Sequence, residues 1–170
     1  MGKKLTLAGK GPGWERCYQD AKAGREIWCV STIFLELQTV EVQPSRVFQL
    51  HGRQLFEPWI EQEQNRVVLM KDDPEFPGAK ALPVKELMGV FGPRFSSTFA
   101  WMLGWALLEG YDDIQVRGVH LGTQSEYFDQ RDAFFWFVGL AQGRGVKIHI
   151  DEDSGVFIAN RAYGVQDAGN

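Results

Sequence analysis

The sequence predicts an α/β fold with three layers, in which about six mostly parallel strands form a sheet that carries helices on both faces. Three observations lead to this prediction. Short apolar runs alternate along the chain with longer helical patterns, which is typical of strands joined by helical crossovers. Several runs, such as "IWCV" and "VVLM", are apolar at consecutive positions and suit strands that are covered on both sides. The 170 residues are enough for one complete core and too few for two.

The same patterns give the expected order of elements. Strands are expected over residues 4–8, 26–31, 46–51, 66–70, 113–119 and 146–150. Helices are expected over residues 15–23, 54–64, 84–90, 97–109 and 127–143. The helix over 97–109 is apolar on all sides, which predicts that it is buried or packed in an oligomer. Thr123 and Glu126 have the spacing of a capping box before the last helix, which Gly143 or Gly145 can end.

The domain organisation expected from these patterns is a single domain over residues 1–153, followed by a polar C-terminal tail over 154–170. The longest irregular connection runs from residue 71 to 92 and is rich in Pro, Gly and charge. Long connections in compact domains are often functional.

Composition and charge exclude several classes of function. The formal net charge of −4 disfavours binding to bulk nucleic acid, but it leaves room for a small nucleotide pocket. No apolar run approaches the ~18 residues that a membrane span needs. Cys17 and Cys29 are too few for a disulfide framework or a zinc site, which fits a reducing cytoplasm. We therefore expect a cytoplasmic protein whose partner is a small molecule, with no membrane and no metal site of its own.

The stretch "GKGPGW" from Gly9 to Trp14 follows the first expected strand directly and precedes the first expected helix. Such a turn gathers backbone N–H groups and the positive end of a helix, which favours an anion, and we name Gly9, Lys10, Gly11 and Gly13 as candidate ligand-binding residues. The alternative is a tight strand-to-helix turn without a ligand. The dinucleotide-binding fingerprint is not met, because Trp14 occupies the place of its last glycine and no acid ends the second strand.

Polar residues also stand at the ends of other expected strands, which meet at one edge of a parallel sheet. Ser31 ends the second strand, His51 ends the third, and His120 follows the fifth. His51 and His120 are the candidate catalytic residues, because imidazole titrates near neutrality and can serve as a general base or as a charged contact to phosphate. The alternative is that each histidine only caps backbone groups.

Two helix starts are expected to join this edge. Ser96, Ser97 and Thr98 can hold a ribose or a phosphate, or can simply cap the buried helix. On the last helix, Tyr127 and Arg131 are candidates for phosphate binding, and the alternative for Arg131 is a salt bridge with a neighbouring acid.

A nucleotide is the expected ligand. Mg²⁺ is a second candidate cofactor, because the long connection contains acidic residues. Asp72, Asp73 and Glu75 can hold the ion beside phosphates, or can form a solvated loop face.

Several stretches together resemble a group of small bacteriophage proteins. The matching stretches are "GKGPG", "FQLH", "DPEFP", "SSTFAWMLGWALLEGYDDIQVRGV", "SEYFDQR" and "GLAQGRGVK", in this order over residues 4–150. That group is in turn remotely similar to the bacterial sialyltransferases that use CMP-sialic acid and to the archaeal-type 6-hydroxymethylpterin diphosphokinases. The resemblance implies a Rossmann-like, nucleotide-binding-type domain.

In the sialyltransferases the glycine turn and the Ser-rich helix start line the nucleotide, and tyrosines bind its phosphate. The resemblance therefore implicates Gly9, Gly11, Ser96, Ser97 and Tyr127. This sequence departs from the pattern at three positions. His120 replaces an acid, and Lys10 and Ser31 replace asparagines.

The leading hypothesis is a phage protein in the host cytoplasm that binds a nucleotide or nucleotide-sugar at the carboxyl edge of the sheet and acts as a small glycosyl- or diphospho-transferase. A second hypothesis is a non-catalytic binder that sequesters a nucleotide signal or a host metabolite. A third is an oligomeric structural or interaction protein with a vestigial pocket. The aromatic run over 134–137 exceeds what one helix face can bury and favours a homo-oligomer.

Overall fold

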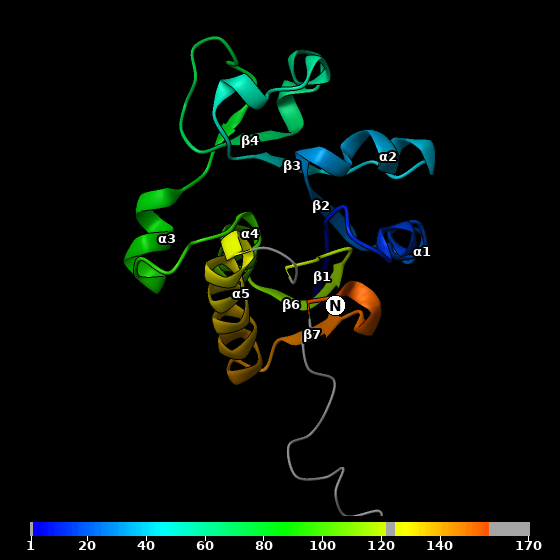
Figure 1. Ribbon diagram of the computed structural model, residues 1–170, viewed down its shortest axis with the longest axis vertical. Coiled ribbons are helices and arrows are strands. Elements are labelled where there is room, and N and C mark those ends of the chain that lie inside the picture. The colour runs from blue at the N-terminus through cyan, green and yellow to red at the C-terminus, as the bar shows by residue number, and fades with distance from the viewer. Residues whose placement is uncertain (1, 122–124, 157–170) are drawn as a thin grey trace, which may run out of the picture.

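The structure is a computed structural model that describes residues 2–121 and 125–156, with backbone only for 125–128. It confirms the α/β prediction. The described strands form one sheet in the order β5-β4-β3-β2-β1-β6-β7, and every pairing is parallel (Figure 1). The strands are β1 Lys3–Ala8, β2 Glu26–Val30, β3 Arg46–Gln49, β4 Val67–Leu69, β5 Lys80–Ala81, β6 Tyr111–Arg117 and β7 Lys147–Ile150. The α-helices are α1 Cys17–Lys22, α2 Phe34–Thr39, α3 Val84–Phe91, α4 Thr98–Leu108 and α5 Ser125–Gly143.

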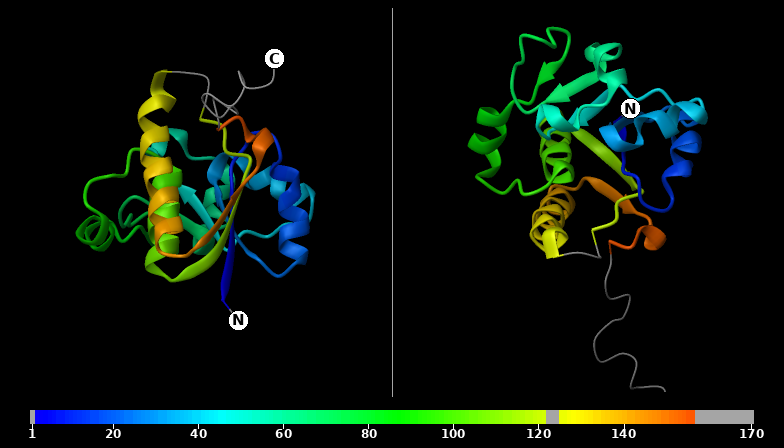
Figure 2. Two further views of the ribbon diagram at one scale, coloured as in Figure 1. Left: turned by 90° about the horizontal axis from the view of Figure 1, so that it is seen from below. Right: turned by 45° about the horizontal axis from the view of Figure 1, so that its top comes forward.

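Helices cover both faces of the sheet, which gives three layers. The left view of Figure 2 shows α1 and α5 on opposite faces. Neighbouring strand residues alternate between two apolar clusters, as Trp28 packs on the α4 side while Ile27 and Cys29 pack on the α1 side. This alternation is the reason why the strands read as continuous apolar runs.

Helix α4 confirms the prediction of a buried helix. Residues 99–106 are all buried, and the helix lies between the sheet and α5. Its start is fixed by Ser97, whose Oγ accepts a hydrogen bond from the backbone N–H of Ala100 at 3.0 Å. The expected capping box of α5 includes Thr123, which lies outside the described residues.

The structure differs from the predicted elements in three places. The helix expected over 54–64 is replaced by the short 3₁₀ turns Arg53–Leu55, Pro58–Glu61 and Gln64–Arg66. Pro58 explains this, because proline has no N–H and disfavours helical backbone at the residue before it, where Glu57 is extended. Helix α2 and strand β5, at six and two residues, were too short to predict from periodicity.

The first residues of the expected tail pack against the domain. Ser154 and Val156 are fully buried, and Val156 belongs to the core on the α4 side. Asp151 and Asp153 hold this segment by ion pairs with Arg16. Within the described residues, none of the helices is long and apolar enough to cross a membrane.

Candidate functional site

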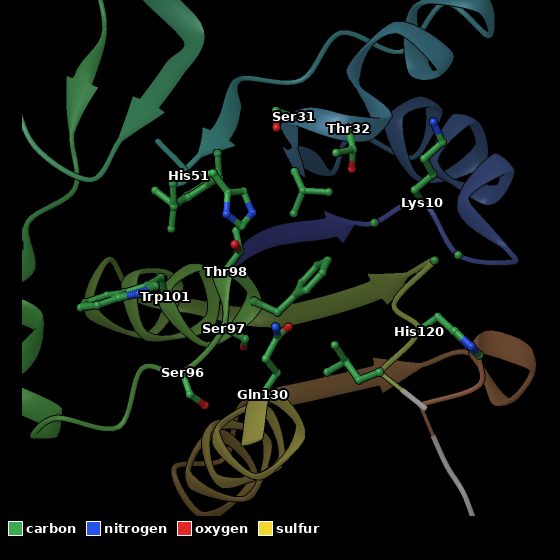
Figure 3. Close-up of a pocket in the computed structure, with 18 of the residues that line it drawn as sticks. Lys10, Ser31, Thr32, His51, Ser96, Ser97, Thr98, Trp101, His120 and Gln130 are labelled. Carbon is green, nitrogen blue, oxygen red and sulfur yellow. The ribbon is translucent and has the colours of Figure 1, made fainter. Parts of the chain in front are cut away.

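A cavity of about 570 Å³ lies at the carboxyl edge of the sheet (Figure 3). It is bordered by residues that end or follow β1, β2, β3, β4 and β6, and by the start of α4. The chain places β2 to β5 on one side of β1 and then crosses back to place β6 on the other side. Such a reversal of strand order opens a crevice beyond the strand ends, where ligands bind in open α/β sheets.

The structure brings most of the candidate residues together around this cavity. Those that line it are Gly9, Lys10, Gly11, Ser31, His51, Ser96, Ser97, Thr98 and His120. Arg131 does not line it, and its Nε donates to the backbone oxygen of Val156 at 3.0 Å. Gly13 faces Asp151 and Arg16 instead of the cavity. Tyr127 falls in α5, but its side chain lies outside the described residues.

The glycine turn is held against the loop after β6. The N–H groups of Gly9 and Gly11 donate to the backbone oxygens of Arg117 at 2.9 Å and Gly118 at 2.7 Å. A Cβ on Gly11 would lie 2.8 Å from the oxygen of Gly118, so the two segments approach closely because these positions are glycines. Since both N–H groups are already bonded, the geometry favours a tight turn over a phosphate cradle at these two donors.

Lys10 leaves the turn towards α2. Its Nζ lies 2.6 Å from Oε1 of Glu36, and the bond to Lys10 lowers the pKa of that carboxyl. The charge of Lys10 at the cavity rim is therefore neutralised by Glu36. A bound phosphate would have to displace Glu36 to pair with Lys10.

The start of α4 provides backbone N–H groups that have no acceptor among the described residues, whereas the N–H groups of Gly9 and Gly11 are already bonded. Among the described residues, no acceptor is placed for the N–H groups of Thr98 and Phe99. Both residues line the cavity, and the positive end of the helix dipole lies there too. Ser96 is engaged elsewhere, because its Oγ donates to the backbone oxygen of Asp129 at 2.5 Å.

The two candidate histidines differ in orientation. In Figure 3 the ring of His51 points towards Thr98 and the centre of the cavity, and it has no hydrogen-bond partner among the described residues. The ring of His120 is turned away, and its Nδ1 lies 3.1 Å from the backbone oxygen of Ser154. Since a carbonyl oxygen only accepts, Nδ1 of His120 carries a proton and is committed to this contact.

The cavity also has residues that were not among the predicted site residues. Gln130 of α5 points its amide into the space and has no partner among the described residues (Figure 3). Gln130 lies one helical turn after Tyr127, so the helical spacing could have placed it on the same face. An apolar wall is built by Val30, Phe48, Leu50, Phe95, Phe99 and Trp101. Trp101 is held in place by Phe95, with ring centroids 3.9 Å apart and planes 7° apart.

None of the described residues that line the cavity is Asp or Glu, and Lys10 at its rim is neutralised by Glu36. Two of the three acids considered for Mg²⁺ are engaged with Arg53, which pairs with Asp73 and lies 2.6 Å from Glu75. The hydrogen bond from Arg53 lowers the pKa of Asp73. Within the described ranges, no three His, Cys, Asp or Glu residues are grouped so that they could hold a metal ion. The cavity therefore suits a neutral or anionic ligand.

The chain matches no protein-family model and none of the curated proteins compared with it. Among solved structures it is similar to thiamine pyrophosphokinase from Bacillus subtilis, with a TM-score of 0.53 and 14% sequence identity. The likeness covers 88% of this chain, which spans only 60% of that chain. At this identity the likeness shows the fold alone. That protein is by its name a pyrophosphokinase, and the comparisons give no support for a phage or sialyltransferase relation.

Proposed function

We propose that this protein binds a nucleotide or nucleotide-sugar in the cavity at the carboxyl edge and acts as a small diphospho-transferase. One observation carries the proposal. Thr98 and Phe99, whose N–H groups have no acceptor among the described residues, line the same 570 Å³ cavity as the aromatic wall, which offers an anion site beside an apolar surface. A phosphorylated heterocycle has these two parts.

The roles of the residues follow from their positions. The phosphate would accept hydrogen bonds from the N–H groups of Thr98 and Phe99, while the ring would lie against Phe48 and the Phe99 side chain. His51 is the group that can take a proton from an acceptor hydroxyl, because its ring points into the cavity and has no hydrogen-bond partner among the described residues.

The fold neighbour supports the reaction class in a general way. That protein is by name a pyrophosphokinase, so a related fold serves diphosphate transfer there. This chain spans 60% of its length, and the activity is carried over only as part of the proposal.

The decisive experiment replaces one donor without harming the helix. Thr98 is the first residue of α4, a position that tolerates proline, and the extended backbone of Ser97 is compatible with a following proline. Thr98→Pro removes the N–H and the hydroxyl, whereas Thr98→Ala removes only the hydroxyl. We expect Thr98→Pro to bind ADP about tenfold more weakly than Thr98→Ala in calorimetric titration, because a hydrogen bond to a charged group is lost. Equal affinities of the two variants would refute the anion site at α4.

A non-catalytic binder is the second candidate, and the absence of Asp and Glu among the described lining residues favours it. A diphospho-transferase would pass the β,γ-diphosphate of ATP to an acceptor hydroxyl, whose proton goes to His51, and would release AMP. His51→Asn should therefore abolish AMP formation followed by ³¹P NMR, while ADP affinity is retained. A binder would return every nucleotide unchanged after denaturation, in the wild type as in the variant.

A further inference from the structure

A second, smaller cavity of about 260 Å³ adjoins the first. The two share Lys10, Ser31 and Thr32, so these residues form a common wall. The far side of the second cavity is built by α2 and by the 3₁₀ turn that carries Trp59. A ligand in this compartment would therefore lie next to a ligand in the first.

Unlike the first cavity, the second compartment is lined by acids. Glu36 and Glu57 line it, against the single cation Lys10. Glu36 is neutralised by Lys10 at 2.6 Å, whereas Glu57 is exposed and has no partner among the described residues. The compartment thus carries an excess of one negative charge, which rises to two if Lys10 moves away.

One polar group points to a ligand independently of these acids. Ser31 lines both cavities and is only 7% exposed, yet its hydroxyl has no hydrogen-bond partner among the described residues. Figure 3, a close-up of the first cavity, shows its oxygen directed from the shared wall into the open space. Polar groups with so little exposure are normally paired, so the missing partner suggests a polar group of a ligand at this wall, such as a hydroxyl.

We propose that the second compartment binds a small hydroxylated organic cation, and that Lys10 couples its binding to that of a phosphate ligand in the first cavity. The proposal rests on the proposed function, because it needs an anion in the first cavity. That anion attracts Lys10 away from Glu36, and the freed carboxylate then binds the cation together with Glu57. Because coupling between sites is reciprocal, each ligand tightens the binding of the other.

The experiment titrates choline into the full chain by calorimetry, with and without saturating ADP. We expect choline to bind at least about fivefold more tightly with ADP present. In Lys10→Met the carboxylate of Glu36 is always free, so choline should bind without ADP as tightly as it binds the ADP-saturated wild type. Glu57→Gln should weaken choline binding and leave ADP binding unchanged. Glu61→Gln, on an exposed acid outside both cavities, is the matched control and should change neither.

The outcomes separate the two proposals. If the wild type does not bind ADP, the proposed function fails. If ADP binds but choline is not bound, or is bound equally with and without ADP, the second compartment is refuted and the first remains. Unchanged coupling in Lys10→Met refutes the role of Lys10, and unchanged choline affinity in Glu57→Gln refutes the acidic site.

Discussion

The two edges of the sheet are built in opposite ways. At the amino edge, the guanidinium of Arg46 lies over the rings of both Trp28 and Trp105, 4.2 and 4.3 Å from their centroids. Glu26 there accepts hydrogen bonds from Trp28, Ser45 and Tyr111. At the carboxyl edge, Ser31, His51 and Gln130 face a cavity without partners among the described residues.

This difference separates the polar groups that stabilise the fold from those that would contact a ligand. Polar groups that bond one another hold the strand starts of the amino edge together, and substitutions there should cost folding free energy. Polar groups that face an open cavity contribute little to folding, and under the proposed function they serve to bind the ligand. The comparison predicts which positions change stability and which change binding.

The largest expected effect is at the amino edge. Trp28 is fully buried and packs on Phe48, Trp105 and Tyr111. Trp28→Ala should lower the free energy of unfolding by about 3–5 kcal/mol, because it leaves a large cavity in the core. Urea denaturation measures this. Trp136→Ala, at a 36% exposed tryptophan, is the control and should cost far less. Similar losses in both variants would contradict the packing described for Trp28.

The second prediction tests the close approach between the glycine turn and the loop after β6 at the carboxyl edge. Gly118 has a φ of 60°, and a Cβ there would collide with the backbone oxygens of Gly9 and Gly11. Gly24 has a φ of 76° with nothing within 4 Å of the added Cβ. Both Gly→Ala substitutions cost about 1–2 kcal/mol for the left-handed backbone. Gly118→Ala should cost more by thermal unfolding and should weaken ADP binding, while Gly24→Ala spares binding. Equal stability losses would show that the close approach is not rigid.

Much of this fold could be predicted from the sequence because the strands and the buried helix α4 have long, regular patterns. The apolar runs of β2 and β4 and the Ser97 cap are local features and lie where they were expected. The helix expected over 54–64 was wrong because Pro58 overrides the apolar spacing. Helix α2 is too short to show a period.

The positions of the candidate site residues could be predicted from the sequence, but their hydrogen-bond partners could not. Strand ends meet at one edge in any parallel sheet, which is why Ser31, His51 and His120 gather there. No sequence pattern shows that the Gly9 and Gly11 donors are taken by the loop after β6, or that His120 turns to Ser154. These partners come from tertiary contacts between distant segments.

Ser31 and Ser45 provide a matched pair of serines for the two edges. Ser31→Ala removes a hydroxyl that has no partner in the described part of the chain, so unfolding should be unchanged while ADP affinity falls by about three- to tenfold. Ser45→Ala removes a hydrogen bond to Glu26 of 2.5 Å, so stability should fall by about 1 kcal/mol with affinity unchanged. Thermal unfolding and calorimetric titration of both variants measure this. If Ser31→Ala lowered stability and Ser45→Ala lowered ADP affinity, the roles assigned to the two edges would be reversed.

The smallest effect is the pH dependence of the amino edge. Burial alone would raise the pKa of Glu26, but hydrogen bonds from Ser45, Tyr111 and Trp28 together with the charge of Arg46 lower it below its usual value. A carboxyl with a lowered folded-state pKa stabilises the protein above its unfolded pKa of about 4.3, and this contribution is lost as the pH falls through the folded value. The wild type should therefore lose its stability advantage over Glu26→Gln between neutral pH and about pH 3, as measured by thermal unfolding at each pH. An advantage that stays constant over this range would mean that the Glu26 carboxylate is not stabilised in its charged form by the amino edge.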